Sequence, residues 1–382
     1  MTPMSAITGP APALDAGPDQ SPERELVRPF ERVAFLYGNP DPADPEAHTL
    51  RWRALAAMLR SDGAPEPAIA ALGVQYAAAM QQPATLAVFA AADGEIVHER
   101  RLVGSGLSDV AGYAAPAPIV PLLVGGQQRP PYLLVVADRT GADLAGSRGA
   151  DHPVQAWTVS GPDDEIERNA PGGWSQLRYQ HRAEDSWKHN AKQVAAAVLA
   201  RLTQLDAEVL VLSGDVRALQ FLRDALPADL DVLVAHIHGS RGADGSQPHR
   251  PEAVARVLRD AADSQTALLL QRFHEHLDQR GLAVEGRAAT LAALGAGRVA
   301  TLFVTDPPDL FARAWFGPGT TEVYPDRHAT VGASPQTRLG MLADVAVRAA
   351  LLAGAHVRVV PAGTPGAPVD GIGALCRYGS PG

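Results

Sequence analysis

The chain has 382 residues, 46% of them hydrophobic and 20% charged, which is typical of globular domains with sizeable cores. Its formal net charge of −9 excludes a protein coated in positive charge for indiscriminate nucleic-acid binding, although a local basic surface is compatible with it. The single cysteine excludes an internal disulfide and a cysteine-based metal site. No apolar run reaches the ~18–20 residues of a membrane span, and the first residues lack the pattern of a secretory signal. We therefore expect a cytoplasmic protein.

The first 28 residues are rich in Pro, Ala, Gly and acidic side chains, which predicts a disordered leader over residues 1–28. An N-terminal α/β domain is expected over residues 29–130. Its predicted elements are a strand, two helices and a hairpin, at residues 32–37, 49–59, 67–80 and 85–102.

The middle domain is expected over residues 131–252, with antiparallel strands followed by alternating helix and strand. This order predicts a mixed sheet with helices packed on it. A long helix should follow residue 172, with one apolar face. The residues of that face are Trp187, Ala191, Val194, Val198 and Leu202. The predicted strands lie at 132–138, 142–145, 155–160, 208–212 and 232–237, and a shorter helix at 216–226.

A helix over 251–279 leads into the C-terminal domain, which is expected over residues 253–382. Its predicted elements are helices at 288–294 and 337–353 and strands at 299–304, 356–361 and 371–378. The segment 307–332 carries Trp315 with several glycines and prolines, and its role is open. The expected fold class is a mixed α/β (α+β) fold of three domains.

Motifs of common enzyme classes are absent from the sequence: there is no P-loop, no G-x-S-x-G elbow and no H-E-x-x-H motif. His236, His238 and His249 fall in one loop-rich region without a spaced acidic partner, which favours solvated histidines over a metal site. The stretch 213–215, Ser-Gly-Asp, opens a helix after a strand. It could line a small-ligand site, but a helix cap is the simpler interpretation. We predict no catalytic residue, no metal and no cofactor.

A glycine pair and a tryptophan stand directly before the long helix, in the stretch PGGWSQLRYQHR at residues 171–182. Glycine pairs cost ordering entropy and are kept where the backbone needs freedom or close approach. Arg178 and Arg182 lie one helical turn apart, which suits contacts with phosphate groups. A flexible surface loop is the open alternative.

This stretch resembles a motif of the archaeal and eukaryotic class-1 peptide release factor superfamily, which includes Pelota. The motif is Gly-Gly-Gln-Ser-x-x-Arg-Phe-x-x-x-Arg. Arg178 and Tyr179 fall in register with it, whereas Arg182 comes one place early. The stretch YLLVVADRTGADL, at 132–144, resembles the strand pair that opens the family's middle domain.

The C-terminal part adds to the resemblance. Residues 283–304 with 371–378 resemble the family's C-terminal domain of the ribosomal-protein L7Ae type. The first domain resembles only a narrower bacterial branch, which includes the ribosome hibernation factor Balon and its actinobacterial relatives.

The resemblance implies that the loop reaches the ribosomal peptidyl-transferase centre, where the family's glutamine helps to place a water on the peptidyl-tRNA ester. Here Trp174 holds the glutamine position. A tryptophan cannot orient water with an amide, but it can stack on a base, which is worth ~1–3 kcal/mol. Gln176 lies two residues later and could act only if the loop were reshaped.

A second Gly-Gly-Gln occurs at 125–127, ahead of Pro130 and Pro131. The prolines preclude a helix starting there, so an interdomain linker is expected. The family's decoding motifs, an Asn-Ile-Lys-Ser tetrapeptide and a Tyr-x-Cys pair, are absent from the first domain.

These residues and the resemblance predict a ribosome hibernation factor that occupies the vacant A site without releasing peptide. The predicted rRNA-binding loop comprises Gly172, Gly173, Trp174, Ser175 and Gln176, and the predicted rRNA-binding helix carries Arg178 and Arg182. The implied partners are the ribosome, its rRNA and an elongation-factor-type GTPase such as elongation factor Tu, with no DNA and no membrane. Two alternatives stay open: a rescue factor that hydrolyses peptidyl-tRNA through Gln176, and an α/β ligand-binding protein unrelated to ribosomes.

Overall fold

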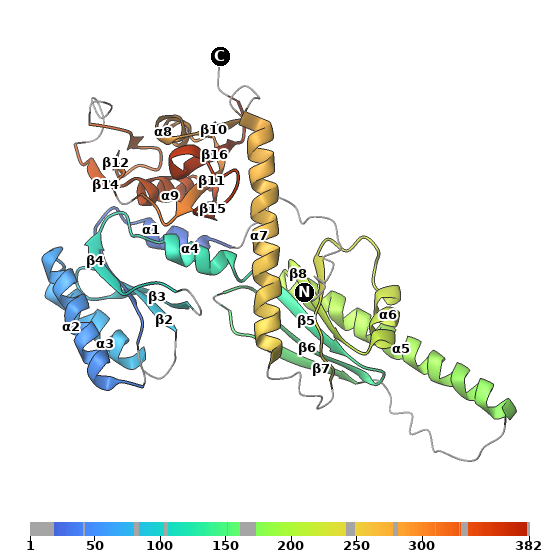
Figure 1. Cartoon of the computed structure of the whole chain (residues 1–382). Helices are drawn as coiled ribbons and strands as arrows, with labels where there is room; N and C mark the ends of the chain where they lie inside the picture. The colour runs from blue at the N-terminus through green and yellow to red at the C-terminus, as the bar shows by residue number, and fades with distance from the viewer. Residues whose placement is uncertain are drawn as a thin grey trace. The chain divides into compact units, whose positions relative to one another are not determined.

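The computed structural model of the chain (Figure 1) divides by its contacts into two compact units. The middle unit contains residues 128–265, and the composite unit joins residues 19–127 with 266–382. The residues that the structure describes are 19–40, 43–79, 84–102, 106–150, 152–160, 173–241, 249–277, 282–309, 311–327, 329 and 335–379, without the side chains of 173–187.

The middle unit is built on a five-stranded sheet in the order β7-β6-β5-β8-β9. The pairs β5–β6 and β6–β7 are antiparallel, whereas β5–β8 and β8–β9 are parallel. The predicted mixed sheet is therefore confirmed. Its strands are β5 (Tyr132–Ala137), β6 (Gly141–Ser147), β7 (Gln155–Ser160), β8 (Val209–Gly214) and β9 (Leu233–His236).

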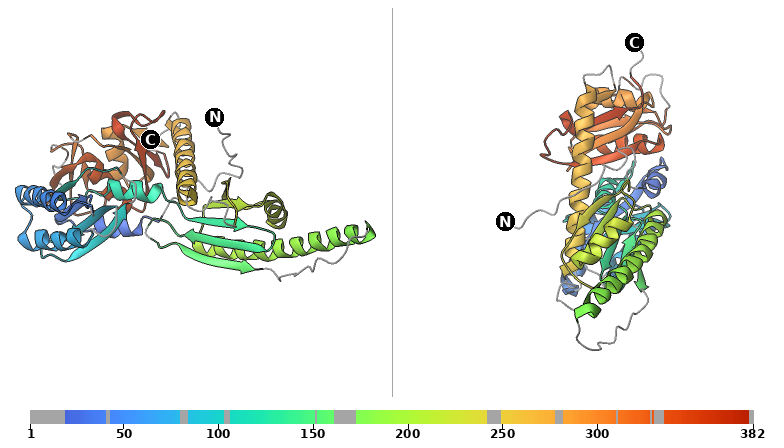
Figure 2. Two further views of the ribbon diagram at one scale, coloured as in Figure 1. Left: turned by 60° about the horizontal axis from the view of Figure 1, so that its bottom comes forward. Right: turned by 90° about the vertical axis from the view of Figure 1, so that its right-hand side faces the viewer.

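Helices cover both faces of this sheet (Figure 2). On one face lie α5 (Gly173–Leu205) and α6 (Val216–Ala225), and on the other lies the first part of α7 (Arg250–Leu277). Alternate residues of a strand point to opposite faces, so Leu133 and Val135 pack toward α5 while Leu134 and Val136 pack toward α7. The predicted apolar face of α5 is confirmed for four residues, Ala191, Val194, Val198 and Leu202, all buried. The side chain of Trp187 lies outside the described residues.

The N-terminal part of the composite unit has an antiparallel sheet in the order β3-β2-β1-β4. Its helices pack against one face through the buried residues Leu55, Leu59 and Leu72. The elements are β1 (Val33–Gly38), α2 (Pro45–Ser61), α3 (Glu66–Ala78), β2 (Thr85–Ala90), β3 (Ile96–Leu102) and β4 (Val110–Ala114).

The C-terminal part has a four-stranded sheet, β10-β16-β11-β15, and a three-stranded sheet, β13-β12-β14. The first contains β10 (Ala283–Glu285), β11 (Val299–Asp306), β15 (His356–Pro361) and β16 (Ile372–Cys376), with α8 (Arg287–Gly295) and α9 (Leu342–Leu352) packed on it. The second contains β12 (Arg313–Phe316), β13 (Val323–Tyr324) and β14 (Arg338–Met341). The helix predicted over 337–353 was therefore too long, because residues 338–341 pair with β12.

The leader predicted over residues 1–28 is wrong from residue 19 onward. Residues Ser21–Val27 form α1, whose Leu26 and Val27 are buried. Glu23 of the same helix pairs with Arg100 at 2.7 Å, and both side chains are only 4% exposed. Three buried positions on one side of a short helix are enough to dock it, although its composition resembles that of a disordered segment.

The second Gly-Gly-Gln is not a linker. It ends helix α4 (Val120–Gln127), and Gln127 is buried. Its amide donates to the Val359 carbonyl at 3.0 Å and accepts from the Val359 N–H at 2.7 Å. Gln20 forms the same pair of bonds with Val357, at 2.8 and 3.0 Å. Both glutamines thus satisfy the outer edge of β15, an edge strand whose backbone groups would otherwise need other partners.

Candidate nucleic-acid interface

Helix α5 runs without interruption for 33 residues from Gly173. The structure therefore corrects the predicted loop: its residues 173–176 form the first turn of the helix, and Gly172 lies outside the described residues. Glycine is tolerated at a helix start, where the backbone N–H groups have no partner inside the helix. Arg178 and Arg182 follow on the same helix, as predicted, although the side chains at 173–187 are not described.

The described half of α5 shows which side of the helix packs on the sheet. Ala191, Val194 and Val198 are buried, whereas His189 and Lys192 are exposed. With ~100° of rotation per residue, positions 174, 178 and 182 lie on the side that carries the exposed residues. The helix thus brings the predicted stacking position and the two predicted phosphate-binding positions onto one side, away from the packed side.

Gln176 falls on the other side of the helix. Two residues rotate the helix by roughly 200°, so position 176 lies almost opposite position 174 and in line with the buried Val194. Among the predicted site residues, 174, 178 and 182 are therefore grouped by the backbone and 176 is separated from them.

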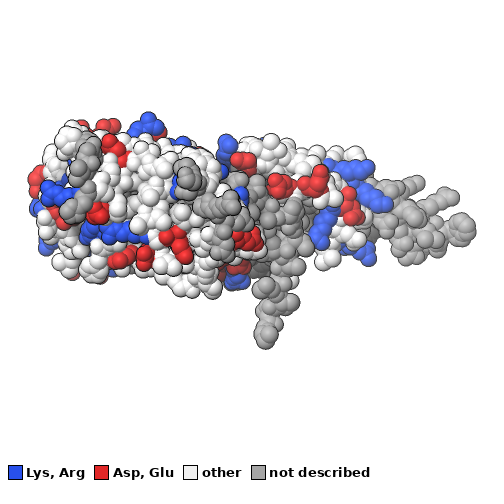
Figure 3. Space-filling model, turned by 90° about the horizontal axis from the view of Figure 1, so that it is seen from above, with Lys and Arg blue, Asp and Glu red and all other residues white. Residues whose placement is uncertain are grey.

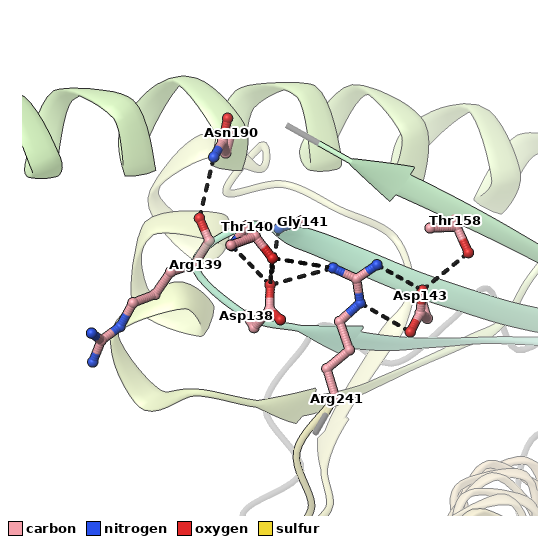
Figure 4. A network of polar contacts seen from close by, with 8 residues as sticks. All are labelled: Asp138, Arg139, Thr140, Gly141, Asp143, Thr158, Asn190 and Arg241. Carbon is pink, nitrogen blue, oxygen red and sulfur yellow. Dashed lines mark hydrogen bonds and ion pairs between the residues drawn. The ribbon is translucent and has the colours of Figure 1, made fainter. Parts of the chain in front are cut away.

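A polar cluster lies at the turn between β5 and β6, and the half of α5 that packs on the sheet is bonded to this turn (Figure 4). Arg241, from the segment after β9, forms a bidentate pair with Asp143: its Nε and Nη2 donate to the two carboxylate oxygens, each at 3.0 Å. The same guanidinium lies 3.4 Å from Asp138. Thr158 on β7 also donates to Asp143, at 3.0 Å. We call Asp138, Asp143 and Arg241 the Arg241 clamp.

The clamp shifts the pKa values of its carboxyl groups. The hydrogen bond from Arg241, opposed by burial and helped by Thr158, lowers the pKa of Asp143. Burial would raise the pKa of Asp138, but hydrogen bonds from Thr140 and the charge of Arg241 outweigh it, so this pKa is also lowered. Both acids are ionised at neutral pH, as an arginine clamp requires.

Two contacts connect the turn to the helices. The buried Asn190 of α5 donates from its amide nitrogen to the Arg139 carbonyl at 3.2 Å. The Arg139 guanidinium lies 3.5 Å from a carboxylate oxygen of Asp215, at the start of α6. The turn is thus fixed against both helices of this face. Sequence reasoning missed Arg241, which is separated from Asp143 by 98 positions and lies in no motif.

The stretch 213–215 is a helix cap, as the simpler interpretation predicted. The Asp215 carboxylate accepts from the N–H groups of Arg217 at 2.9 Å and Ala218 at 3.1 Å. Gly214 has φ of +132°, and a Cβ there would lie 1.9 Å from the Ala137 carbonyl oxygen. Only glycine fits this close approach between the ends of β5 and β8.

Of the three histidines predicted to be solvated in a loop, His238 is exposed, whereas His236 ends strand β9 and is half-buried. His236 contacts Arg223, and burial, with the charge of Arg223, lowers the pKa of this histidine. Within the described residues, no group of three or more His, Cys, Asp or Glu side chains could hold a metal ion. No helix in the described part of the chain is long and apolar enough to cross a membrane.

Charge is mixed on the one face of the molecule that Figure 3 draws. On the face drawn in Figure 3, basic and acidic side chains of the described residues are interspersed, with no single field of positive charge. The only two lysines of the chain, Lys188 and Lys192, are both exposed on α5. A basic surface for nucleic acid is therefore local, and α5 is its best candidate.

Residues 131–279 match the family model of the bacterial archaeo-eukaryotic release factor family 2. This range holds the whole sheet of the middle unit with α5, α6 and α7. The middle unit is thus similar to this family, and the stretches 132–144 and 172–182 that carry the sequence resemblance lie within the matched range.

Relatives and solved structures extend the comparison over more of the chain. The uncharacterized proteins MT2704 and Rv2629 of Mycobacterium tuberculosis (strains CDC 1551 and H37Rv) are each 28% identical over 265 residues, 68% of this chain and 69% of theirs. Pelota of Archaeoglobus fulgidus aligns with 99% of this chain and 95% of its own, at 13% identity and a TM-score of 0.36. A model of ribosome-bound archaeal Pelota and ABCE1 aligns with 99% of this chain and 97% of its own, at 14% identity and a TM-score of 0.41.

Proposed function

We propose that this protein binds the vacant A site of idle ribosomes and acts as a hibernation factor that does not release peptide. One observation carries the proposal. Within the range matched by a release factor family, a helix of 33 residues begins at the glycine pair, and Trp174 stands where the family's motif has glutamine.

The length of α5 would allow the start of this helix to enter a narrow binding site. The first buried residue among its described side chains is Asn190, 17 residues after the helix begins. At 1.5 Å per residue, the helix start lies ~25 Å along the helix axis from Asn190. Figures 1 and 2 show this half of the helix extending beyond the strands. The other half packs on the sheet, and Asn190 bonds it to the turn that the Arg241 clamp holds, so this half orients the start of the helix.

The side on which positions 174, 178 and 182 lie supports binding to RNA. A tryptophan can stack on an unpaired base, and arginines spaced by one turn can each contact a phosphate. Lys188 and Lys192 lie farther along the exposed side of the helix. No hydrolysis is expected from Trp174, which lacks an amide.

Ribosome binding at graded salt tests the proposal. Purified protein should co-sediment with vacant 70S ribosomes, and the double variant Arg178→Ala/Arg182→Ala should bind at least tenfold more weakly with a shallower salt dependence. The slope should fall by about one for each arginine that no longer neutralises a phosphate. The matched control removes two exposed arginines from α7 of the same unit, Arg256→Ala/Arg259→Ala, and should bind like the wild type. Failure of the wild type to co-sediment would refute the function, and equally weakened binding of both variants would remove α5 from the interface.

The alternative function is a rescue factor that hydrolyses peptidyl-tRNA through Gln176. The family match favours it, because release factors are hydrolytic, but the separation of positions 174 and 176 on the helix opposes it. An elongation-factor-type GTPase such as elongation factor Tu is proposed as a partner on the resemblance alone, and a ribosome partner would place the protein in the cytoplasm. We also propose that the chain is similar to the Balon branch of the family, and that its three domains span residues 29–130, 131–252 and 253–382.

A further inference from the structure

The three-stranded sheet β13-β12-β14 of the composite unit has two unlike faces. Ala314, Phe316 and Val323 are buried and belong to the main core with α9. Arg338 lies on the same inner face, where its guanidinium stacks on Phe30 at 4.4 Å from the ring centre. Because side chains alternate along a strand, the neighbours of these residues form an outer face.

The register fixes which residues share that outer face. Trp315 on β12 pairs with Tyr324 on β13 and with Leu339 on β14, so the three side chains form a row across all three strands. Arg313 and Met341 form the next row. We call these five residues the outer row face. Leu339 is 51% exposed, and Phe311, two residues before β12, is 91% exposed.

The composition of the outer row face matches that of the centre of a protein–protein interface. Protein–protein interface centres are enriched in Trp, Tyr, Phe, Met and Arg and depleted in Lys, Glu and Asp. The outer row face has no lysine and no acid. Two nearby acids bind their own loops: Asp309 accepts from the Phe311 N–H at 2.8 Å, and Glu322 accepts from the Gly319 N–H at 3.0 Å.

Two observations decide the chemistry of the partner. First, the cations are at the surface: Arg313 is exposed, and the exposed Arg327 guanidinium lies 5.9 Å from the centre of the Trp315 ring. Arginines beside an apolar row complement carboxylates, which they bind in bidentate fashion. Second, Trp315 and Tyr324 are aromatic, but Leu339 and Met341 beside them on β14 are aliphatic and offer no ring for a base to stack on. Single-stranded nucleic acid relies on successive stacked bases, so a row that is half aliphatic suits apolar side chains of a protein better.

We propose that the outer row face docks a segment of a partner protein in which apolar side chains stand next to carboxylates. The row of Trp315, Tyr324 and Leu339 takes the apolar side chains, while Arg313 and Arg327 hold the acids. This inference does not depend on ribosome binding.

A selection experiment tests it with the full chain immobilised. The probe is a random dodecapeptide library on phage, counter-selected on the Leu339→Arg variant. Enriched peptides should combine Leu, Ile, Phe or Trp with Asp or Glu. Synthetic copies should bind the wild type and bind at least tenfold more weakly to Leu339→Arg or Trp315→Ala, because central anchors dominate interface energies.

Two further variants make the outcome specific. Arg327→Glu should no longer bind the acidic peptides and should bind copies in which Lys replaces Asp and Glu. The control Leu50→Arg changes a side chain that is 61% exposed on α2, and it should leave the affinity unchanged. Because Leu339 is at the surface, the Leu339→Arg variant should stay folded. Hydrogen exchange of α9 in this variant should therefore equal that of the wild type.

Three results would overturn the proposal. The first is no enrichment, or equal binding of the peptides to Leu339→Arg. The second is tight binding of a labelled U20 RNA that Trp315→Ala abolishes, which would make the face an RNA platform. The third is concentration-dependent self-association in sedimentation velocity that Leu339→Arg removes, which would make the occupant a second copy of the chain.

Discussion

One ion pair of each unit shows how differently this protein places its charged side chains. In the composite unit, Glu23 and Arg100 pair at 2.7 Å with both side chains only 4% exposed. In the middle unit, Arg241 pairs with Asp143 at 3.0 Å while the two side chains are 18% and 48% exposed. Water can replace a partner in the second pair but not in the first. The buried pair thus holds α1 in the fold, whereas the Arg241 clamp orients a turn beneath α5 at little energetic cost.

The largest effect should come from breaking the buried pair. Arg100→Leu removes the guanidinium that pairs with the buried Glu23 carboxylate, which should lower the free energy of unfolding by ~3–5 kcal/mol. Urea unfolding of the full chain, with hydrogen exchange of α1, measures this decrease. The double variant Glu23→Leu/Arg100→Leu should recover most of it, because two apolar groups then face each other.

An exposed pair of the same unit is the control for that comparison. Arg60 and Glu66 pair at 2.8 Å with side chains 56% and 69% exposed. Arg60→Leu should therefore change stability by less than ~1 kcal/mol. Equal destabilisation by Arg100→Leu and Arg60→Leu would show that burial does not separate the two kinds of pair.

A smaller effect is expected from the glutamine at the edge of β15. Gln127→Ala leaves the backbone N–H and C=O of Val359 without their side-chain partner, which should cost ~1–3 kcal/mol. Hydrogen exchange at Val359 should accelerate, since its N–H no longer has that acceptor. The neighbouring Gln128 is exposed, so Gln128→Ala should leave both stability and exchange unchanged. Unchanged protection of Val359 in Gln127→Ala would contradict this role.

Arg241→Ala should destabilise the middle unit by only about 1 kcal/mol at neutral pH, because the clamp is partly exposed. The pKa of Asp143 is lowered in the folded state, so its ionised form contributes stability above the ordinary carboxyl pKa. That contribution is lost as pH falls through the lowered pKa. The difference between wild type and Arg241→Ala should therefore shrink in acid, as measured by hydrogen exchange of β5 and β6. A difference independent of pH, or one matched by Arg217→Ala on α6, would argue against the clamp.

Local patterns made much of the middle unit predictable. The apolar runs of β5 and β8 and the period of α5 are visible within short windows, and they predicted the mixed sheet and the packed side of the helix. Long-range partners were not predictable. Arg241 meets Asp143 across 98 positions, and Gln127 meets Val359 across 232. Nothing local to either residue marks its partner.

Short elements were missed for a different reason. Strands β12 and β14 have four residues each, and β13 has two, so none gives a clear period. Residues 338–341 continue into α9 without a helix breaker other than Gly340, which led to one long predicted helix. At the candidate site the sequence located the helix and its arginines. It did not show that the helix begins at Gly173, because a glycine pair before a tryptophan is typical of a loop.

The smallest effect is expected on peptide release, for which a rescue factor would show a large effect. Ribosomes that carry peptidyl-tRNA should release no peptide above background with the wild-type protein, and Gln176→Ala should behave identically. Position 176 lies roughly opposite position 174 on the helix, so its amide cannot replace the family's glutamine while α5 keeps its first turn. A misplacement of about 1 Å already costs on the order of 100-fold in rate, and the two sides of a helix are several ångströms apart.

Trp174→Gln restores the family's Gly-Gly-Gln and serves as the gain-of-function arm of a single-turnover assay. Release by the wild type that disappears in Gln176→Ala would establish the rescue enzyme and reject the hibernation proposal. Release by Trp174→Gln alone would instead show that the first turn of α5 still reaches the peptidyl-tRNA ester. One side chain would then separate a protein that only occupies the site from one that catalyses release.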